Sequence, residues 1–179
     1  PAPGSAWDSP AVNRLDRALR GLLNGAPRPE PFQTLAGELL SEPASRPPGS
    51  LLELGYEEGG SWLARHAWNV AKLSVFLGRQ MGYGPADLQT LALASLLYDA
   101  GMLEVPGEIL DKPAALDDAE FNRIRRHPEA GSALLERVAG LSPVAARVAL
   151  EHHERSDGSG YQKQSREADT HPFSRLIAV

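Results

Sequence analysis

Cysteine is absent from the 179 residues of the sequence. This absence excludes disulfide bonds and thiolate metal ligands, so any metal ion must be bound by histidine or carboxylate side chains. It also fits a reducing compartment, and we expect a cytoplasmic protein. Long apolar runs are absent too, because none approaches the roughly 20 residues that a membrane-spanning helix needs. We therefore expect no membrane span in this chain.

Basic residues are fewer than acidic ones: the sequence has 18 Lys and Arg residues and 23 Asp and Glu residues, which give a formal net charge of −5. Proteins that bind DNA or RNA usually gather basic residues on one face. The longest basic cluster here, Arg123 to Arg126, is short and interrupted. We expect no nucleic-acid polymer as a partner.

Strand-like alternation is also lacking, whereas apolar residues spaced three and four apart recur along the chain. Helices are expected at about residues 12–23, 32–40, 61–81, 88–99, 117–126, 130–138 and 143–154. The pattern predicts an all-α fold. Its strongest break is the proline-rich segment 41–50. We therefore predict a small N-terminal helical annex or linker over residues 1–50 and a main domain over residues 51–179.

Two of the expected helices bear on a functional site. In the helix at 61–81, Leu63, Val70 and Leu77 predict the buried face, and His66 lies one turn before Val70. We expect His66 to point inward. The helix at 88–99 is apolar almost throughout and should be the buried centre of the fold. Asp99 ends it close to the core, where an unpaired carboxylate is costly, so this residue needs a partner.

Four of the five histidines stand in unusual positions. His66 is on the expected inward face, His127 precedes a proline, and His152 and His153 are adjacent at a helix end. A single histidine on a helix is usually a core or boundary residue, but an adjacent pair has little structural purpose. Imidazole and carboxylate ligands suit zinc, iron and manganese. The alternative is a buried hydrogen-bonded network without metal.

Taken together, these residues resemble the HD-GYP family of the HD superfamily. The resemblance rests on HAWNVA at 66–71, LLYDAGM at 96–102, the segment 105–113 with its Val-Pro and Lys-Pro pairs, HPEAG at 127–131 and HHERSDGSGYQ at 152–162. The segments follow the family order, and the similarity spans about residues 51–179.

The resemblance implies an HD-superfamily helical bundle that hydrolyses cyclic di-GMP at a site with two or three metal ions. It implies that Asp99, His127, His152 and His153 surround one ion, and that Asp99 bridges to a second ion held by His66 and the motif histidine. It also implies that a loop contacts the substrate or diguanylate cyclase partners, although an ordinary glycine-rich turn is the alternative. That loop contains Asp157, Gly158, Gly160 and Tyr161.

Three substitutions depart from the family pattern. Tyr98 stands in place of the histidine of the HD pair, Met102 in place of a lysine that contacts the substrate phosphate, and Gln162 in place of the proline of GYP. A tyrosine ligates only when the metal drives its deprotonation, as a ferric ion can. Without the proline, the loop should be less restrained. The family also has a further ligand aspartate after the segment that matches 175–179, so the C-terminal end looks truncated.

The sequence therefore predicts a degenerate HD-GYP domain with a regulatory or binding role in cyclic di-GMP signalling and weak or absent catalysis. The pattern provides for one or two ions of iron, manganese or zinc, and we expect a single bound ion, at the site of Asp99. The annex should pack on the main domain and relay signals from an upstream module. Two alternatives stay open: an active phosphodiesterase that uses Tyr98 as a ligand or needs one ion, and a metal-free protein-interaction scaffold.

Overall fold

The computed structural model describes residues 9–25, 27–43, 61–162 and 169–178, and these residues form helices and turns without a strand. The predicted all-α fold is confirmed. The elements in chain order are α1 (Pro10–Gly21), α2 (Glu30–Ser41), α3 (Trp62–Gln80), α4 (Pro85–Leu97), the 3-10 helix η2 (Ala100–Glu104), α5 (Gly107–Leu110), α6 (Asp118–Ile124), α7 (His127–Glu136), α8 (Pro143–Glu151) and α9 (Pro172–Ile177). Among the described helices, none is long and apolar enough to cross a membrane.

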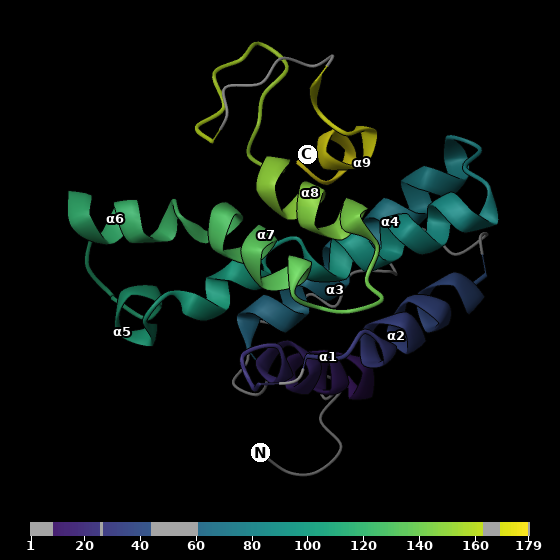
Figure 1. Cartoon of the computed structure of the whole chain (residues 1–179), viewed down its shortest axis with the longest axis horizontal. Coiled ribbons are helices and arrows are strands. Elements are labelled where there is room, and N and C mark those ends of the chain that lie inside the picture. Colours follow the sequence, from purple (N-terminus) through teal and green to yellow (C-terminus); the bar gives the residue numbers. More distant parts are fainter. Residues whose placement is uncertain (1–8, 26, 44–60, 163–168, 179) are drawn as a thin grey trace.

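Helix α4 is the buried centre, as its apolar sequence predicts. Every residue from Leu91 to Leu97 is buried, because α4 is in contact with α2, α3, α8 and α9. In Figure 1, α7 and α8 lie across the middle of the molecule, with α1 and α2 on one side and α9 on the other. The C-terminal end of α4 therefore points Tyr98 and Asp99 into the centre of the fold.

The buried face of α3 differs from the predicted one. It consists largely of small residues such as Ala67, Ala71 and Gly78, whereas Leu77 is 39% exposed. A Cβ atom on Gly78 would lie 2.8 Å from a methyl carbon of Leu91. Small side chains on this face let α3 approach α4 closely, which rotates the larger side chains of α3 toward its flanks and toward solvent.

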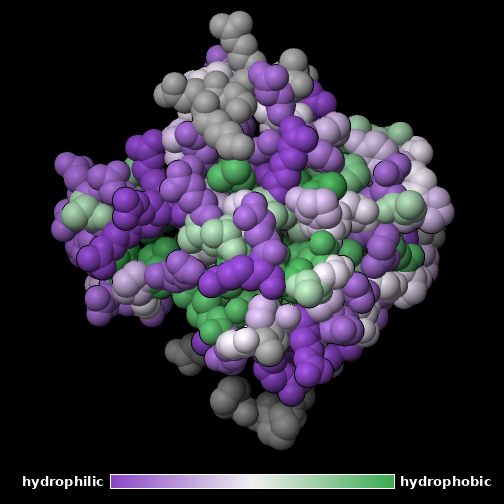
Figure 2. Space-filling view, viewed as in Figure 1, coloured by the Kyte–Doolittle hydropathy of each residue, from purple (hydrophilic) through white to green (hydrophobic). Residues whose placement is uncertain are grey.

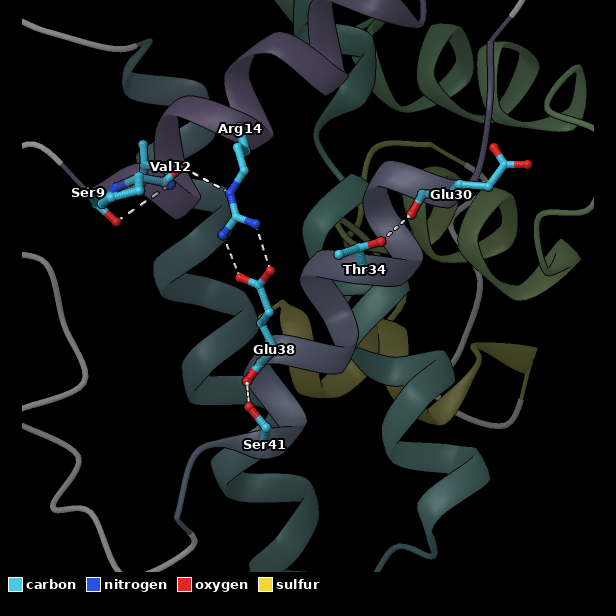
Figure 3. Close-up of polar contacts among 8 residues, drawn as sticks. Ser9, Val12, Arg14, Glu30, Thr34, Glu38 and Ser41 are labelled. Atoms are coloured by element: carbon cyan, nitrogen blue, oxygen red, sulfur yellow. Dashed lines mark hydrogen bonds and ion pairs between the residues drawn. The ribbon is translucent and has the colours of Figure 1, made fainter.

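The N-terminal helices α1 and α2 share one apolar core with the rest of the fold. Leu15, Phe32 and Leu35 are at most 2% exposed and belong to the same cluster as the buried residues of α3 and α4. Figure 3 shows the guanidinium of Arg14 on α1 bonded to both carboxylate oxygens of Glu38 on α2, at 2.6 and 2.5 Å. The annex therefore packs on the main body. The predicted boundary near residue 50 lies outside the described residues, so the division stays a prediction.

Several helix limits differ from the sequence expectation. Helix α7 begins at His127 rather than at residue 130, because Pro128 in its first turn needs no N–H partner and is compatible with helical geometry. Helix α8 ends at Glu151, before the histidine pair. The short elements η2, α5 and α9 were not expected, since four to six residues are too few to show a period.

Glu151 joins α8 to α9. Its carboxylate accepts a hydrogen bond from Arg147 Nε at 2.8 Å, from the His171 N–H at 2.8 Å and from the Ser174 hydroxyl at 3.1 Å. The residue is 5% exposed. Because hydrogen bonds to a charged group are worth about 1.5–3 kcal/mol, Glu151→Gln should lower the free energy of unfolding by about 2 kcal/mol.

Urea titration of the variant measures this loss. The matched control is Glu136→Gln at the exposed end of α7, which should change the free energy of unfolding by less than about 0.5 kcal/mol. Equal stabilities of the two variants would contradict the structural role given to Glu151.

Candidate metal centre

Three segments meet at the centre of the fold. Asp99 lies between α4 and η2, His127 is the first residue of α7, and His152 follows α8 directly. A glycine pair sets the distance between the first two segments. A Cβ atom on Gly101 would lie 1.9 Å from the carbonyl oxygen of His127 and 2.5 Å from the backbone nitrogen of Gly131. The backbones of η2 and α7 are thus in direct contact, and this brings Asp99 beside His127.

The polar atoms of these residues converge on one point. Asp99 Oδ1 lies 3.2 Å from His127 Nε2 and 3.4 Å from His152 Nε2, and the two Nε2 atoms are 3.0 Å apart. Burial alone would raise the pKa of Asp99, but hydrogen bonds and charge from His127 and His152 hold it well below its usual range. Asp99 is therefore an ionised carboxylate. It has the partners that its position in the sequence requires.

Backbone hydrogen bonds fix the orientation of both imidazole rings. Nδ1 of His127 is 2.8 Å from the carbonyl oxygen of Ile124, and Nδ1 of His152 is 2.8 Å from that of Ala149. A carbonyl oxygen only accepts, so each Nδ1 carries the hydrogen, and Nε2 of each ring is the atom that would donate a lone pair to a metal ion. The two Nε2 atoms and the carboxylate thus face one another, an arrangement that requires either protons between these atoms or a bound cation.

The donor set fits a transition-metal ion. Two ligand atoms that each lie about 2.1 Å from the same ion are about 3.0 Å apart in octahedral geometry and about 3.4 Å apart in tetrahedral geometry. The distances among Asp99 Oδ1 and the two Nε2 atoms, 3.0–3.4 Å, match these values. His153 belongs to the same group, because ligand atoms of His127, His152 and His153 lie within 4.8 Å of one another. Burial, followed by the charges of the other two histidines, lowers the pKa of His153 to about 4. Its ring is therefore neutral at pH 7 and free to ligate.

The residues predicted for a second ion are arranged differently. His66 is exposed on α3, so its predicted inward position is wrong, because the small residues of α3 occupy the buried side. Its ring centroid is 6.1 Å from that of Tyr98, which in turn is 5.0 Å from that of His152. Burial and the neighbouring Asp99 raise the pKa of Tyr98 far above its usual value. The buried phenol is therefore a neutral group between His66 and the histidine cluster.

The profile of one protein family, described as the HD domain, matches residues 49–179. The chain belongs to the HD domain family. A cyclic di-GMP phosphodiesterase of Pseudomonas aeruginosa is 37% identical over 123 residues, which are 68% of this chain and 30% of that protein. A 3'3'-cGAMP-specific phosphodiesterase of Vibrio cholerae is 37% identical over 115 residues, 64% of this chain and 26% of that protein.

A solved structure supports the HD fold. An HDG"Y"P protein from Bdellovibrio bacteriovorus superposes with a TM-score of 0.75 at 20% identity, covering 99% of this chain and 60% of that one. The curated relatives above are proteins of which this chain spans less than a third. The predicted HD-superfamily bundle is thus confirmed.

In this HD domain the predicted loop folds back on the histidine pair. Gly158 has a φ of 79°, and the carboxylate of Asp157 accepts hydrogen bonds from the N–H and hydroxyl of Ser159 at 2.9 and 2.6 Å. A Cβ atom on Gly160 would lie 2.6 Å from Cα of Glu154, so the loop backbone touches the turn that follows α8. This contact places Tyr161 beside the cluster.

Gln162 restrains the loop, contrary to the expectation from its missing proline. Its N–H donates to Glu154 Oε1 at 3.2 Å, and its side-chain amide donates to the carbonyl oxygen of Arg125 at 2.7 Å. A proline has no N–H and could form neither bond. Met102, in place of the family lysine, is 8% exposed within the apolar core, and it contributes packing rather than charge.

Sequence reasoning missed the residues that support the cluster. It did not anticipate the carbonyl acceptors of Ile124 and Ala149. It also did not anticipate the hydrogen bonds that Gln162 donates to Arg125 and Glu154. The only signal in the sequence is spacing, since each carbonyl precedes its histidine by three residues. Every residue has a backbone carbonyl, so residue type does not reveal which carbonyl accepts a hydrogen bond. The three-residue spacing therefore has no predictive value by itself.

Proposed function

We propose that this HD domain binds cyclic di-GMP at a centre with one complete metal site, and that its phosphodiesterase activity is weak or absent. The observation that carries the proposal is the convergence of Asp99 Oδ1 and the Nε2 atoms of His127 and His152 within 3.0–3.4 Å. Relatives named as cyclic di-GMP phosphodiesterases favour this nucleotide as the ligand.

Asp99, His127, His152 and His153 would hold the ion. An iron, manganese or zinc ion bound there would act as a Lewis acid on a phosphoryl oxygen and lower the pKa of a bound water. The protein's own contribution is positional. The Nδ1 hydrogen bonds to Ile124 and Ala149 hold both rings in the tautomer that ligation requires, and Asp99 balances the positive charge.

Two features support weak catalysis. The neutral phenol of Tyr98 is a poor ligand for divalent ions, so the site that also needs His66 is incomplete. The apolar Met102 removes a cation from the place where the family has its phosphate-contacting lysine. Losing one preorganised electrostatic group costs about 10²- to 10³-fold in rate. Contact of the loop at residues 157–161 with diguanylate cyclase domains, and relay through the N-terminal annex, stay predictions.

The test combines metal analysis with nucleotide titration. Protein purified without chelator should contain about one transition-metal ion per chain, as expected for a single closed ligand set. Calorimetric titration should then show binding of cyclic di-GMP with little turnover, and 3'3'-cGAMP serves as the comparison ligand. Neither metal nor nucleotide binding would leave a protein-interaction scaffold. Rapid metal-dependent turnover would establish an active phosphodiesterase.

Tyr98→His tests the damaged second site. Replacing the phenol with imidazole supplies a neutral nitrogen ligand next to His66 and Asp99, so metal content should rise from about one to about two ions per chain. Hydrolysis of cyclic di-GMP should increase at least about tenfold, because a second ion stabilises charge on the reacting phosphate. Mass spectrometry of bound metal and product chromatography measure both effects.

The control is Tyr98→Phe, which removes the hydroxyl but adds no ligand and should leave the metal content at about one ion. If the histidine variant also retains one ion, Tyr98 is not the reason for a single metal site, and this part of the proposal is wrong.

A further inference from the structure

A row of three side chains leads away from the histidine cluster. The ring of His153 lies 4.8 Å from the ring of Tyr161, with an interplanar angle of 31°. On Tyr161 lies the guanidinium of Arg125, 4.6 Å from the ring centroid. Arg125 directly follows α6 and stands two residues before His127. The row therefore connects a proposed metal ligand to a cation at the edge of the same site.

The position of Arg125 is restrained at its backbone by a hydrogen bond and at its guanidinium by the ring of Tyr161. The amide of Gln162 donates to the backbone carbonyl of Arg125, and the Gln162 N–H donates to Glu154. The close contact of Gly160 with Glu154 holds the loop that carries Tyr161. A guanidinium held by stacking and by its own backbone loses little conformational freedom when it binds a ligand.

The charge environment of Arg125 differs from that of five other cations of the protein. Arg14, Arg20, Arg147, Arg155 and Lys112 each lie within 4.0 Å of a carboxylate. Within the described part of the chain, Arg125 has no ion pair, and its guanidinium lies over the aromatic rings of Tyr161 and Phe121. The N–H donors of Arg125 are thus available to an external anion.

The surroundings are accessible to a polar ligand. Arg125 is half-buried, whereas its neighbours Arg123 and Arg126 are exposed. Figure 2 shows mainly hydrophilic residues over α6, at the left of the view. Met102, by contrast, is buried in the apolar core and offers no charge to a phosphate.

The chemistry of a cyclic dinucleotide matches two binding points. Its ring contains two phosphodiester groups, so when one lies at the histidine cluster the other is held some distance away in the same molecule. The planar fork of a guanidinium pairs with two phosphate oxygens at once. We infer that Arg125 binds the second phosphate, the one that does not lie at the metal site, and that Tyr161 is its positioning residue. This inference rests on the proposed binding of cyclic di-GMP.

Arg125→Gln in the metal-loaded protein is the decisive variant. Because a charge-assisted bidentate contact is lost, its Kd for cyclic di-GMP, measured by calorimetry, should increase about 10- to 100-fold. GMP has a single phosphate, so its Kd should change less than about threefold. Arg125→Lys keeps the charge without the planar fork and should give an intermediate Kd. Arg126→Gln, which removes the neighbouring exposed cation, is the matched control and should bind cyclic di-GMP as the unchanged protein does.

Metal content and melting temperature separate binding from folding, and neither should change in Arg125→Gln. Equal affinity of this variant and the unchanged protein for cyclic di-GMP would overturn the role of Arg125 while leaving the proposed function intact. An equal loss of affinity for GMP would overturn the assignment to the second phosphate. If the unchanged protein binds no cyclic di-GMP, the proposed function itself is wrong and the inference falls with it.

Discussion

His152→Ala is expected to abolish metal binding. The variant removes one of two Nε2 atoms that lie 3.0 Å apart and both face Asp99, so the remaining ligands no longer enclose an ion. Metal content should fall from about one ion to below about 0.1 per chain, because closed sites depend on their full ligand set. Mass spectrometry of protein purified without chelator measures this directly.

A chelator gives a second readout in the folded protein. A ligand at 100 times its Kd stabilises the native state by about 2.7 kcal/mol. At about 2–4 °C per kcal/mol for a chain of this size, adding chelator should lower the Tm of the unchanged protein by about 5–10 °C. The Tm of His152→Ala should fall by less than about 1 °C, because no ion is there to remove.

The fifth histidine supplies the control. His171 lies outside the cluster and accepts a hydrogen bond from the Phe173 N–H at the start of α9. His171→Asn keeps an acceptor for this cap, so metal content and the response to chelator should match the unchanged protein. If His152→Ala keeps its metal, the cluster is a hydrogen-bonded network and the ion lies elsewhere.

The fold was predictable where the hydrophobic pattern was strong. The continuous apolar run before Asp99 correctly identified α4 as the buried centre, because a helix that is apolar on all sides must be covered on all sides. The same reasoning failed for α3. Its largest apolar residues suggested the buried face, yet close packing against α4 selects small residues such as Ala67 and Ala71. Which face of α3 is buried depends on the shape of α4, and the hydrophobic pattern of α3 alone carries no information about α4.

The candidate site was predictable as a set of residues but not as an environment. Motif order brought Asp99, His127 and His152 together correctly. The exposure of His66 followed from the rotation of α3, and the hydrogen bonds of Gln162 followed from the path of a loop that returns to α6. Sequence reasoning treated Gln162 only as a missing proline. It could not foresee that the replacement supplies two donors that the loop uses.

Gly101 determines whether the site can form at all. A Cβ atom at this position would lie 1.9 Å from the carbonyl oxygen of His127, and backbone atoms cannot move aside as a flexible side chain can. In Gly101→Ala, η2 and α7 must separate, which opens the contact between Asp99 and His127. The free energy of unfolding should fall by about 3–5 kcal/mol, at the upper end of single-residue effects. Chemical denaturation measures the loss, and metal content should fall with it.

The matched control is the same substitution where space is free. Gly37 lies inside α2, and a Cβ atom there meets nothing within 4 Å. Because alanine favours a helix interior over glycine, Gly37→Ala should stabilise the protein by about 0.5–1 kcal/mol. The two variants therefore change stability in opposite directions for one methyl group. A loss below about 1 kcal/mol in Gly101→Ala, with metal still bound, would mean that η2 and α7 are not in backbone contact and that Asp99 is positioned by other means.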